Sequence, residues 1–436
     1  MKRGAQLVGR RSAAELAFRA GDRCRSRNLA TSGFSLAIDP TASNGGRVCP
    51  TSYHYGPEAL TRTQDLATDC AYIIGGLYGN VEALTAIQAR AALESEAPSL
   101  VFNGDFNFFN SSREDWQHIN DFVRAHHAIA GNVELEASND EGGSCGCAYP
   151  MYVSDGVVDR SNAIVEELRA VALACSEDTR AWLQGLPKVM TLRLGTLRLG
   201  VVHGDCATLA GWTFSVEAME PLDTVLRASL GCEDPRYAVT TTEDVKQALE
   251  AAEVDAIACT HTCLPFAQVY AGAAAGGRRA GTFGADESVP SSSSVHSSSA
   301  AIFNNGSAGM PNFRGDLRGI ITRVARSSEV PHDSLYGVQL GDVRMDALPV
   351  RPTYLWPLPP LLLLRLLLLR LLLSGSPFFA RRFCHQVNYD HDRWVARFLR
   401  RWPEGSPAYV SYHGRITQGP DFRVEQAARD GVLLAA

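Results

Sequence analysis

The sequence lacks two features that would assign it to a class of protein at once, a basic surplus and a dense cysteine pattern. The net charge is −6 over 436 residues, so there is no basic surplus of the kind that nucleic-acid-binding proteins use, and we expect no nucleic-acid partner. The eleven cysteines lack the dense, regular spacing of a small secreted scaffold, which indicates reduced thiols. The apolar content of 45% is ordinary, and a chain of this length can form one large domain with appendages.

A secretory signal is also absent near the amino terminus. Residues 1–38 carry eight Lys or Arg residues against two acidic ones, and no apolar stretch follows them. The segment Ser12–Ala30 can form a basic amphipathic helix, a pattern typical of an organelle transit peptide. We therefore predict an intracellular protein, imported into a mitochondrion or plastid if this segment is a transit peptide. A disordered basic tail is the alternative.

No apolar run is long enough to span a membrane. The longest, Pro357–Leu373, is a leucine repeat interrupted by Arg365 and Arg370. A spanning helix needs about 20 apolar residues, and each arginine at mid-bilayer costs about 2.5–3.5 kcal/mol. We interpret residues 351–384 as a Leu-rich insertion and expect no membrane partner. Residues 385–436 contain apolar side chains at helical spacing and are interpreted as a helical C-terminal appendage.

Strand-like and helix-like segments alternate through residues 50–350, which we interpret as the main domain. Short apolar runs precede segments with helical periodicity, and a hairpin is expected to turn near Gly195. A helix is expected over Asp159–Cys175. Strand–helix units followed by a run of strands predict an α/β core with mixed sheets. Residues 271–300, rich in serine, are interpreted as a low-complexity loop insertion.

Short polar turns follow most of the predicted strands. Ligands of open α/β sheets bind at the carboxyl ends of the strands, because the loops converge there. Singly, each turn is ordinary turn chemistry, but their Asp, Asn and His side chains are together the oxygen and nitrogen donors of a divalent metal site. The turns are GGLYGN (Gly75–Asn80), NGDF (Asn103–Phe106), AGNVE (Ala130–Glu134), VVHGD (Val201–Asp205) and CTHTCLP (Cys259–Pro265).

In their order and spacing, these turns resemble the metal-binding boxes of the calcineurin-like metallophosphoesterase superfamily, over about Ala71–Pro349. The family pattern runs Asp-x-His, Gly-Asp, Gly-Asn-His, His-Gly and Gly-His-Thr-His, and ends with a strand and an Asn-Pro-Gly-Ser type turn. FNNGSAGMP (Phe303–Pro311) is similar to that last turn. The resemblance implies a four-layer α-β-β-α sandwich of two mixed β-sheets and a phosphate-ester substrate.

The resemblance also implies one complete set of metal ligands. The second metal site of the family falls on Asp105, Asn132, His203 and His261, all of which keep a donor atom. We predict that these four residues bind a single divalent ion, Mn, Fe or Zn. Asp105 and His203 are the predicted catalytic residues.

The first metal site of the family is not preserved. Its Asp and His fall on Gly76 and Tyr78, and its last His falls on Cys263. The general-acid His falls on Val133, which has no proton to give. Tyr78 and Cys263 are possible additional ligands, because phenolate and thiolate are donors, and a small packed thiol is the alternative at Cys263.

Four further residues are weaker candidates. Asp205 follows the His-Gly box and either orients a histidine or closes a turn. Asn305 lies in the glycine turn after a predicted strand and either lines the pocket or serves the backbone. His126 and His127 lie on the strand that leads to the Gly-Asn box, and one of them is a candidate replacement for the missing general acid.

These observations predict a metal-dependent phosphoesterase-fold hydrolase that acts on a phosphomonoester or phosphodiester through a single-metal site. Two metals about 3.5–4 Å apart normally share a bridging nucleophile, and losing a positioned general acid typically costs about 10²–10⁴-fold in rate. We therefore expect slow or highly specific hydrolysis rather than fast, generic phosphatase activity. The alternative is a non-catalytic metal-binding module that recognises a phosphorylated partner.

Overall fold

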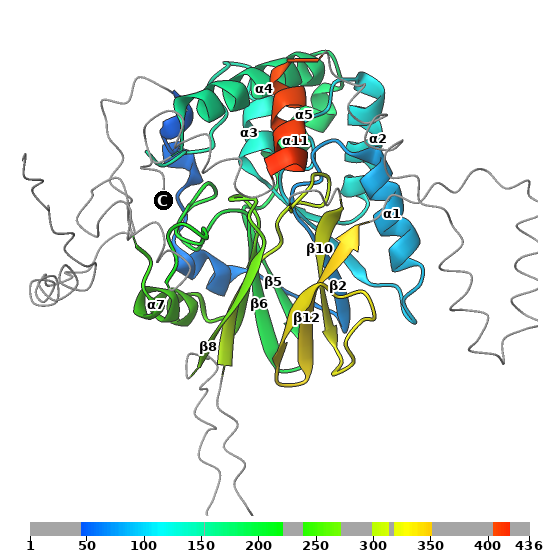
Figure 1. Cartoon of the computed structure of the whole chain (residues 1–436), viewed down its shortest axis with the longest axis vertical. Helices are drawn as coiled ribbons and strands as arrows, with labels where there is room; N and C mark the ends of the chain where they lie inside the picture. The colour runs from blue at the N-terminus through cyan, green and yellow to red at the C-terminus, as the bar shows by residue number, and fades with distance from the viewer. Residues whose placement is uncertain are drawn as a thin grey trace, which may run out of the picture. The chain divides into compact units, whose positions relative to one another are not determined.

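The computed structural model describes residues 45–151, 153–220, 239–271, 299–313, 318–350 and 404–418 (Figure 1). The predicted transit peptide, residues 272–298 of the serine-rich insertion, the Leu-rich insertion and most of the C-terminal appendage lie outside these residues. Within the described part of the chain, no helix combines the length and apolar character needed to cross a membrane.

The first of two six-stranded sheets has a parallel half and an antiparallel half. Its strands are β2 (Cys70–Ile74), β3 (Ser99–Asn103), β4 (His127–Ile129), β10 (Gly319–Arg326), β11 (Tyr336–Leu340) and β12 (Val343–Val350). They lie in the order β11-β12-β10-β2-β3-β4. The first three in the chain are parallel neighbours, and the other three join antiparallel, as expected for strand–helix units followed by a run of strands.

The second sheet is also mixed. Its strands are β1 (Asp65–Ala67), β5 (Val189–Leu194), β6 (Leu197–Val202), β7 (Ala256–Cys259), β8 (Phe266–Ala271) and β9 (Ser299–Asn304). Their order is β1-β5-β6-β7-β9-β8, with β6, β7 and β9 parallel to one another. The predicted hairpin joins β5 to β6, and Gly195 in its turn has a φ of 58°.

Helices cover the outer face of each sheet. The α-helices are α1 (Val81–Ala91), α2 (Arg113–Arg124), α3 (Asn132–Ala137), α4 (Asp155–Leu173), α5 (Glu177–Gln184), α7 (Thr242–Ala252) and α11 (Pro407–Gln418), and the 3-10 helices are η1 (Gly45–Arg47), η2 (Thr51–Tyr53) and η3 (Pro57–Arg62). Residues of α1, α2, α4 and α5 pack on the first sheet, and those of α7 and η3 pack on the second. Helix α4 begins at Asp155, four residues before the predicted start.

The alternation of side chains along the strands creates the four layers. In β2, Tyr72 and Ile74 pack among the helices, whereas Ala71 and Ile73 face the core between the two sheets. Such a period of two buries both faces of a central strand, which is why the sequence shows continuous apolar runs. The predicted α/β fold of two mixed sheets between helical layers is confirmed, and α11 is the described part of the predicted helical appendage.

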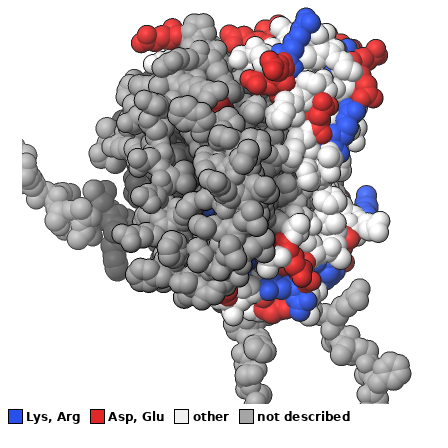
Figure 2. Space-filling view, turned by 90° about the vertical axis from the view of Figure 1, so that its right-hand side faces the viewer, with Lys and Arg blue, Asp and Glu red and all other residues white. Residues whose placement is uncertain are grey.

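Charges of both signs are interspersed on the face of the described surface drawn in Figure 2. Several form surface ion pairs, such as Arg124 with Asp178 at 2.6 Å. Exposed pairs of this kind contribute at most about 1 kcal/mol each, so the stability of the domain comes mainly from its apolar layers.

Candidate metal centre

The four predicted metal ligands come from the carboxyl ends of four parallel strands, two in each sheet. Asp105 and Asn132 follow β3 and β4 in the first sheet, and His203 and His261 follow β6 and β7 in the second. All four are buried. The centre therefore lies where the two sheets bring their strand ends together, as predicted from the position of the polar turns.

Their donor atoms converge on one point. The Nε2 atom of His203 lies 3.2 Å from Oδ1 of Asn132, 3.3 Å from Oδ1 of Asp105 and 3.2 Å from Nδ1 of His261. Donor atoms of Asp105, His203 and His261 all lie within 4.8 Å of one another. Ligands bound about 2.0–2.2 Å from one ion are about 3.0–3.6 Å apart, so this spacing suits neighbouring ligands of a single ion.

Hydrogen bonds on the outer side of the histidines fix which nitrogen of each ring is free to coordinate. His203 Nδ1 lies 2.9 Å from the carbonyl oxygen of Asn103, and His261 Nε2 lies 3.0 Å from that of Cys147. A carbonyl oxygen only accepts, so these two nitrogens carry the hydrogen in the neutral rings. The lone pairs of His203 Nε2 and His261 Nδ1 then point into the centre.

The orientation of Asn132 is fixed in the same way. Its Nδ2 donates to the carbonyl oxygen of Cys145 at 2.8 Å, which turns Oδ1 toward His203. With the carboxylate of Asp105, four acceptor atoms thus face one another, and none of the four carries a hydrogen in the neutral state of the rings. Such an arrangement is stable only around a cation, so the donor set fits a divalent metal ion.

The pKa values of Asp105 and His203 respond to the same crowding. Burial favours the neutral form of each, but their mutual attraction and hydrogen bond outweigh it. The pKa of Asp105 is therefore lowered, and that of His203 is raised. A cation between the two side chains is favoured by the anionic carboxylate, whether that cation is a proton or a metal ion.

Glu134 supports the centre, and its role was not predicted from the sequence. Its buried carboxylate accepts hydrogen bonds from the backbone N–H groups of Asp105 at 2.7 Å, Phe106 at 3.0 Å and Gly131 at 2.9 Å. These bonds hold Asp105 at a φ of 55°, a left-handed conformation that is unfavourable for a residue with a side chain. Burial and the nearby Asp105 charge raise the pKa of Glu134 to about 7, although the backbone donors oppose the shift.

A signal for Glu134 was present in the sequence. It lies three residues after Gly131, the spacing at which an acidic side chain returns to the first backbone N–H of a helix. The signal was hidden because Gly131, the residue just before α3, has no side chain. The usual capping box needs a side chain at that position to accept a hydrogen bond from the helix in return.

Tyr78 fills the space beside Gly76, the position onto which the resemblance places a ligand of the first metal site. A Cβ atom placed on Gly76 would lie 2.8 Å from Cζ and 2.9 Å from Cε2 of the Tyr78 ring. The ring is buried and packs against Phe108 and Phe109, each with a centroid distance of 5.6 Å. Position 76 therefore cannot carry a ligand while Tyr78 keeps this orientation.

Tyr78 and Cys263 interact with each other. Tyr78 Oη lies 2.6 Å from Cys263 Sγ, which also donates to the carbonyl oxygen of His261 at 3.3 Å. Burial raises the pKa of Tyr78 well above its usual value, so the phenol stays protonated near neutral pH. Within the described residues, the group of converging donors contains Asp105, His203 and His261 and does not include Cys263.

The weaker candidates have structural surroundings. The carboxylate of Asp205 accepts hydrogen bonds from the backbone of residues 207, 208 and 213 and from the Thr213 hydroxyl, so it closes a turn. Asn305 is buried and accepts from the Thr322 hydroxyl at 2.6 Å. His126 and His127 are exposed at the amino end of β4, opposite the end that carries Asn132, so the idea that one of them replaces the general acid is wrong.

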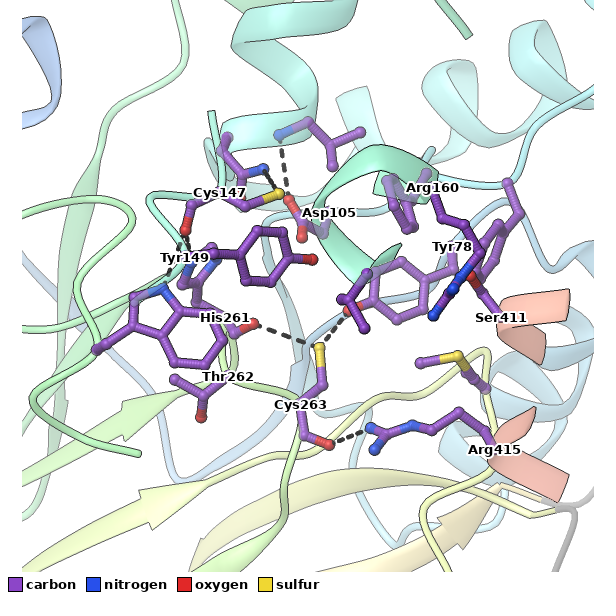
Figure 3. Close-up of a pocket in the computed structure, with 17 residues that line it drawn as sticks. Tyr78, Asp105, Cys147, Tyr149, Arg160, His261, Thr262, Cys263, Ser411 and Arg415 are labelled. Atoms are coloured by element: carbon purple, nitrogen blue, oxygen red, sulfur yellow. Dashed lines mark hydrogen bonds between the residues drawn. The ribbon is translucent and has the colours of Figure 1, made fainter. Parts of the chain in front are cut away.

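A cavity of about 110 Å³ opens beside the centre (Figure 3). Asp105, Asn132 and His261 lie in its wall, together with Val133, the residue that stands in the general-acid position. Much of the remaining wall is aromatic: Tyr78, Phe108, Phe109, Tyr149 and Trp212. The cavity is thus a partly open, largely apolar space with a polar donor cluster at one side, the usual form of a small-molecule site.

Comparisons with known proteins are informative only at the level of the fold. No protein-family model matches the chain, and no curated protein matches it. A metallophosphoesterase from Sphaerobacter thermophilus is 14% identical over 64% of this chain and 87% of its own, with a TM-score of 0.34. A hypothetical protein from Pyrococcus horikoshii is 13% identical over 59% of this chain and 83% of its own, with a TM-score of 0.34.

A protein serine/threonine phosphatase from Saccharomyces cerevisiae is 10% identical over 67% of this chain and 86% of its own, with a TM-score of 0.31. With TM-scores this low, the fold assignment rests on the order of the strands and the loops at their carboxyl ends. The two mixed sheets between helical layers are what the resemblance to the calcineurin-like metallophosphoesterases implied.

Proposed function

We propose that this protein is a metal-dependent phosphoric ester hydrolase that uses one divalent ion, Mn, Fe or Zn. Asp105, Asn132, His203 and His261 hold the ion. The observation that carries the proposal is the convergence of four hydrogen-free donor atoms, three of them 3.2–3.3 Å from His203 Nε2. The resemblance of the strand-end turns supplies the reaction class, hydrolysis of a phosphomonoester or phosphodiester.

The ion would supply Lewis-acid polarisation of a phosphoryl oxygen and activation of water. The chain itself orients the donors: the Asn103 carbonyl holds the His203 ring, and the Val133 N–H donates to Oδ1 of Asp105 at 3.2 Å. The largely aromatic wall of the cavity lowers the polarity around the donors, which strengthens the electrostatic interactions near it. Val133 has no proton to give a leaving group, so turnover should be fastest with esters of acidic alcohols.

A second function is favoured by one specific observation. The Tyr78 ring fills the place of the other metal site, so the two-metal arrangement cannot form in this conformation. A chain with one metal and no general acid can instead bind a phosphorylated partner without hydrolysing it. Metal binding is common to both functions, and turnover distinguishes them.

The test is metal content per chain, measured by elemental analysis on the full-length protein, followed by hydrolysis assays. p-Nitrophenyl phosphate and bis(p-nitrophenyl) phosphate represent the two ester classes, and p-nitrophenol is an acidic leaving group. We expect about one ion per chain, lost in Asp105→Ala and His261→Ala but kept in His126→Ala, whose ring is exposed and away from the centre. Turnover should follow metal occupancy across these variants.

The other outcomes are equally clear. Stoichiometric metal with phosphate binding and no turnover would establish the non-catalytic module. If the protein binds no ion under any supplementation, the four donors do not act as a metal site, and the hydrolase proposal fails. Hydrolysis that persists in both Asp105→Ala and His203→Ala would place the reaction elsewhere.

A further inference from the structure

A helix from the C-terminal part of the chain contributes to the cavity beside the metal centre. Helix α11 contacts α4 and carries Ser411 and Arg415 into the cavity wall (Figures 1 and 3). The two residues are four positions apart and share one face of the helix. None of the polar turns that resemble the metallophosphoesterase pattern lies in this part of the sequence.

Arg415 is anchored directly to the loop that carries a metal ligand. Its side chain is buried, and Nη2 donates to the carbonyl oxygen of Cys263 at 2.6 Å. Cys263 follows His261 by two residues, and its Sγ donates to the His261 carbonyl oxygen. Burial of a guanidinium group is costly because the charge loses its water. An anionic ligand in the cavity would offset this cost, because it would interact with the positive charge of Arg415.

A second arginine lines the same cavity. Arg160 extends from α4, and Figure 3 shows its side chain near Tyr78 and Ser411. Arg160 and Arg415 therefore both line a cavity of about 110 Å³ whose wall also contains Asp105, Asn132 and His261. Guanidinium groups match phosphate oxygens in geometry and charge, and a largely apolar surround strengthens the interaction.

We propose that Arg160 and Arg415 bind the phosphate group of the substrate, which makes α11 a recognition element of this site and a small phosphomonoester its substrate class. The inference rests on the proposed function and narrows it. Two arginines and one divalent ion favour a dianionic monoester over a monoanionic diester. The volume of about 110 Å³ accommodates a phosphate group with a short organic group, and a longer organic group would extend through the open side of the cavity.

The direct test measures binding of inorganic phosphate to the metal-loaded, full-length protein by isothermal titration calorimetry. Arg160→Met and Arg415→Met keep an apolar stem similar to that of arginine and remove the charged guanidinium group. Each should weaken phosphate binding by about 10-fold or more, because a charge-assisted hydrogen bond is lost, and metal content should not change. Arg326→Met is the matched control, since Arg326 is an exposed arginine paired with Asp69 and Asp342 away from the cavity.

A second variant tests the position of α11 without removing a charge. In Ser411→Trp the indole should occupy the cavity and abolish phosphate binding while the metal stays bound. In the hydrolysis assay, the wild type should prefer p-nitrophenyl phosphate to bis(p-nitrophenyl) phosphate, and the KM for the monoester should rise more than kcat falls in both arginine variants. Wild-type phosphate affinity in both arginine variants, or in Ser411→Trp, would overturn the inference.

These outcomes are separable from those of the proposed function. Arginine-dependent phosphate binding without turnover of either ester would support the recognition role and refute the hydrolase. Metal-dependent hydrolysis that is faster with the diester and is unchanged in both arginine variants would support the hydrolase and refute the recognition role. Absence of phosphate binding by the metal-loaded wild type would also refute it.

Discussion

The substitution Gly76→Ala tests whether the Tyr78 ring fills the space beside Gly76. Gly76 has a φ of 53°, and an added Cβ would lie within 3.0 Å of two ring atoms of Tyr78. The left-handed backbone costs about 1 kcal/mol for an alanine. Forcing the methyl group into the packed ring costs about 1–3 kcal/mol more. We therefore expect Gly76→Ala to lower the free energy of unfolding by about 2–4 kcal/mol.

The matched control is Gly341→Ala, in the turn between β11 and β12. Gly341 has a φ of 59°, and an added Cβ would meet no heavy atom within 4 Å. This control isolates the backbone cost of about 1 kcal/mol. Urea unfolding curves with m-values, recorded for both variants, give the steric cost at Gly76 as the difference between the two changes.

A double-mutant cycle identifies the Tyr78 ring as the cause. Tyr78→Ala should itself cost about 3–5 kcal/mol through the cavity that it leaves. In that background, Gly76→Ala should cost only about 1–2 kcal/mol, because the Cβ of Ser307, 3.1 Å from the added methyl, is the remaining close neighbour. The double variant should therefore be more stable than the sum predicts. Equal costs of Gly76→Ala in the two backgrounds, or a cost equal to that of Gly341→Ala, would refute the reasoning.

Three further predictions concern the metal, its supporting carboxylate and the acid stability of the domain. If the ion is present at about 100 times its Kd, its removal by EDTA should lower the melting temperature of the wild type by roughly 5–10 °C. The melting temperature of His261→Gln should not change on addition of EDTA. Equal shifts of the two proteins in thermal unfolding would contradict this prediction. Glu134→Gln should lower metal affinity and destabilise the domain by about 2 kcal/mol, because the backbone donors around Asp105 lose a charged acceptor. A metal titration measures the first effect and urea unfolding the second. An unchanged metal affinity would show that Glu134 does not support the site. At Asp65, burial raises the pKa, but hydrogen bonds from Thr191, Arg198 and Arg193 outweigh it and lower the pKa from 3.8 to about 2. The lowered pKa of Asp65 therefore contributes to the free energy of unfolding above about pH 5, and this contribution is lost as the pH falls toward 2. The pKa shift corresponds to about 2.4 kcal/mol, which solvent screening reduces to about 1 kcal/mol. In Asp65→Asn, the free energy of unfolding measured in urea should depend less on pH between about 5 and 2.

Local patterns in the sequence predicted an α/β core with mixed sheets and polar side chains grouped at strand ends, and the family resemblance supplied the four-layer arrangement and the set of four donors. Continuous apolar runs predicted buried strands, and polar turns after them predicted donors at one edge of the sheets. The orientation of those donors could not be predicted, since it depends on long-range acceptors such as the carbonyl oxygens of Asn103 and Cys147. The contribution of α11 was equally hidden, because Arg415 contacts a residue 152 positions earlier in the chain.

The sequence showed that Tyr78 stands where the related family has a metal ligand, but it did not show what the tyrosine does there. A tyrosine in that turn was compatible with a phenolate ligand or with a packed ring, and only the backbone decides between them. Tyr78 has a φ of 54°, and this conformation directs its ring into the space beside Gly76 and places its hydroxyl on Cys263. The metal-ligand interpretation of Tyr78 stays a prediction, and the neutral, buried phenol argues against it.

Backbone strain concentrates around the centre. Within the described residues, five positions other than glycine have a positive φ, and three of them line the cavity: Tyr78, Asp105 and Cys263. Each such conformation costs of order 1–3 kcal/mol and persists only where surrounding contacts hold it. At Asp105 those contacts are the three hydrogen bonds to Glu134, and at Tyr78 and Cys263 they are the aromatic packing and the contact between the two side chains.

This distribution separates the two halves of the site physically. The strain at Asp105 directs a carboxylate toward three other donors, whereas the strain at Tyr78 and Cys263 closes the neighbouring space with a ring and a thiol. Restoring an aspartate at position 76 alone should therefore not create a second metal site, because the ring would still occupy the volume that the ligand needs. If the centre holds one ion, as proposed, packing as well as the missing ligands accounts for it, and metal content in Gly76→Asp should stay at one ion per chain or fall as the domain is destabilised.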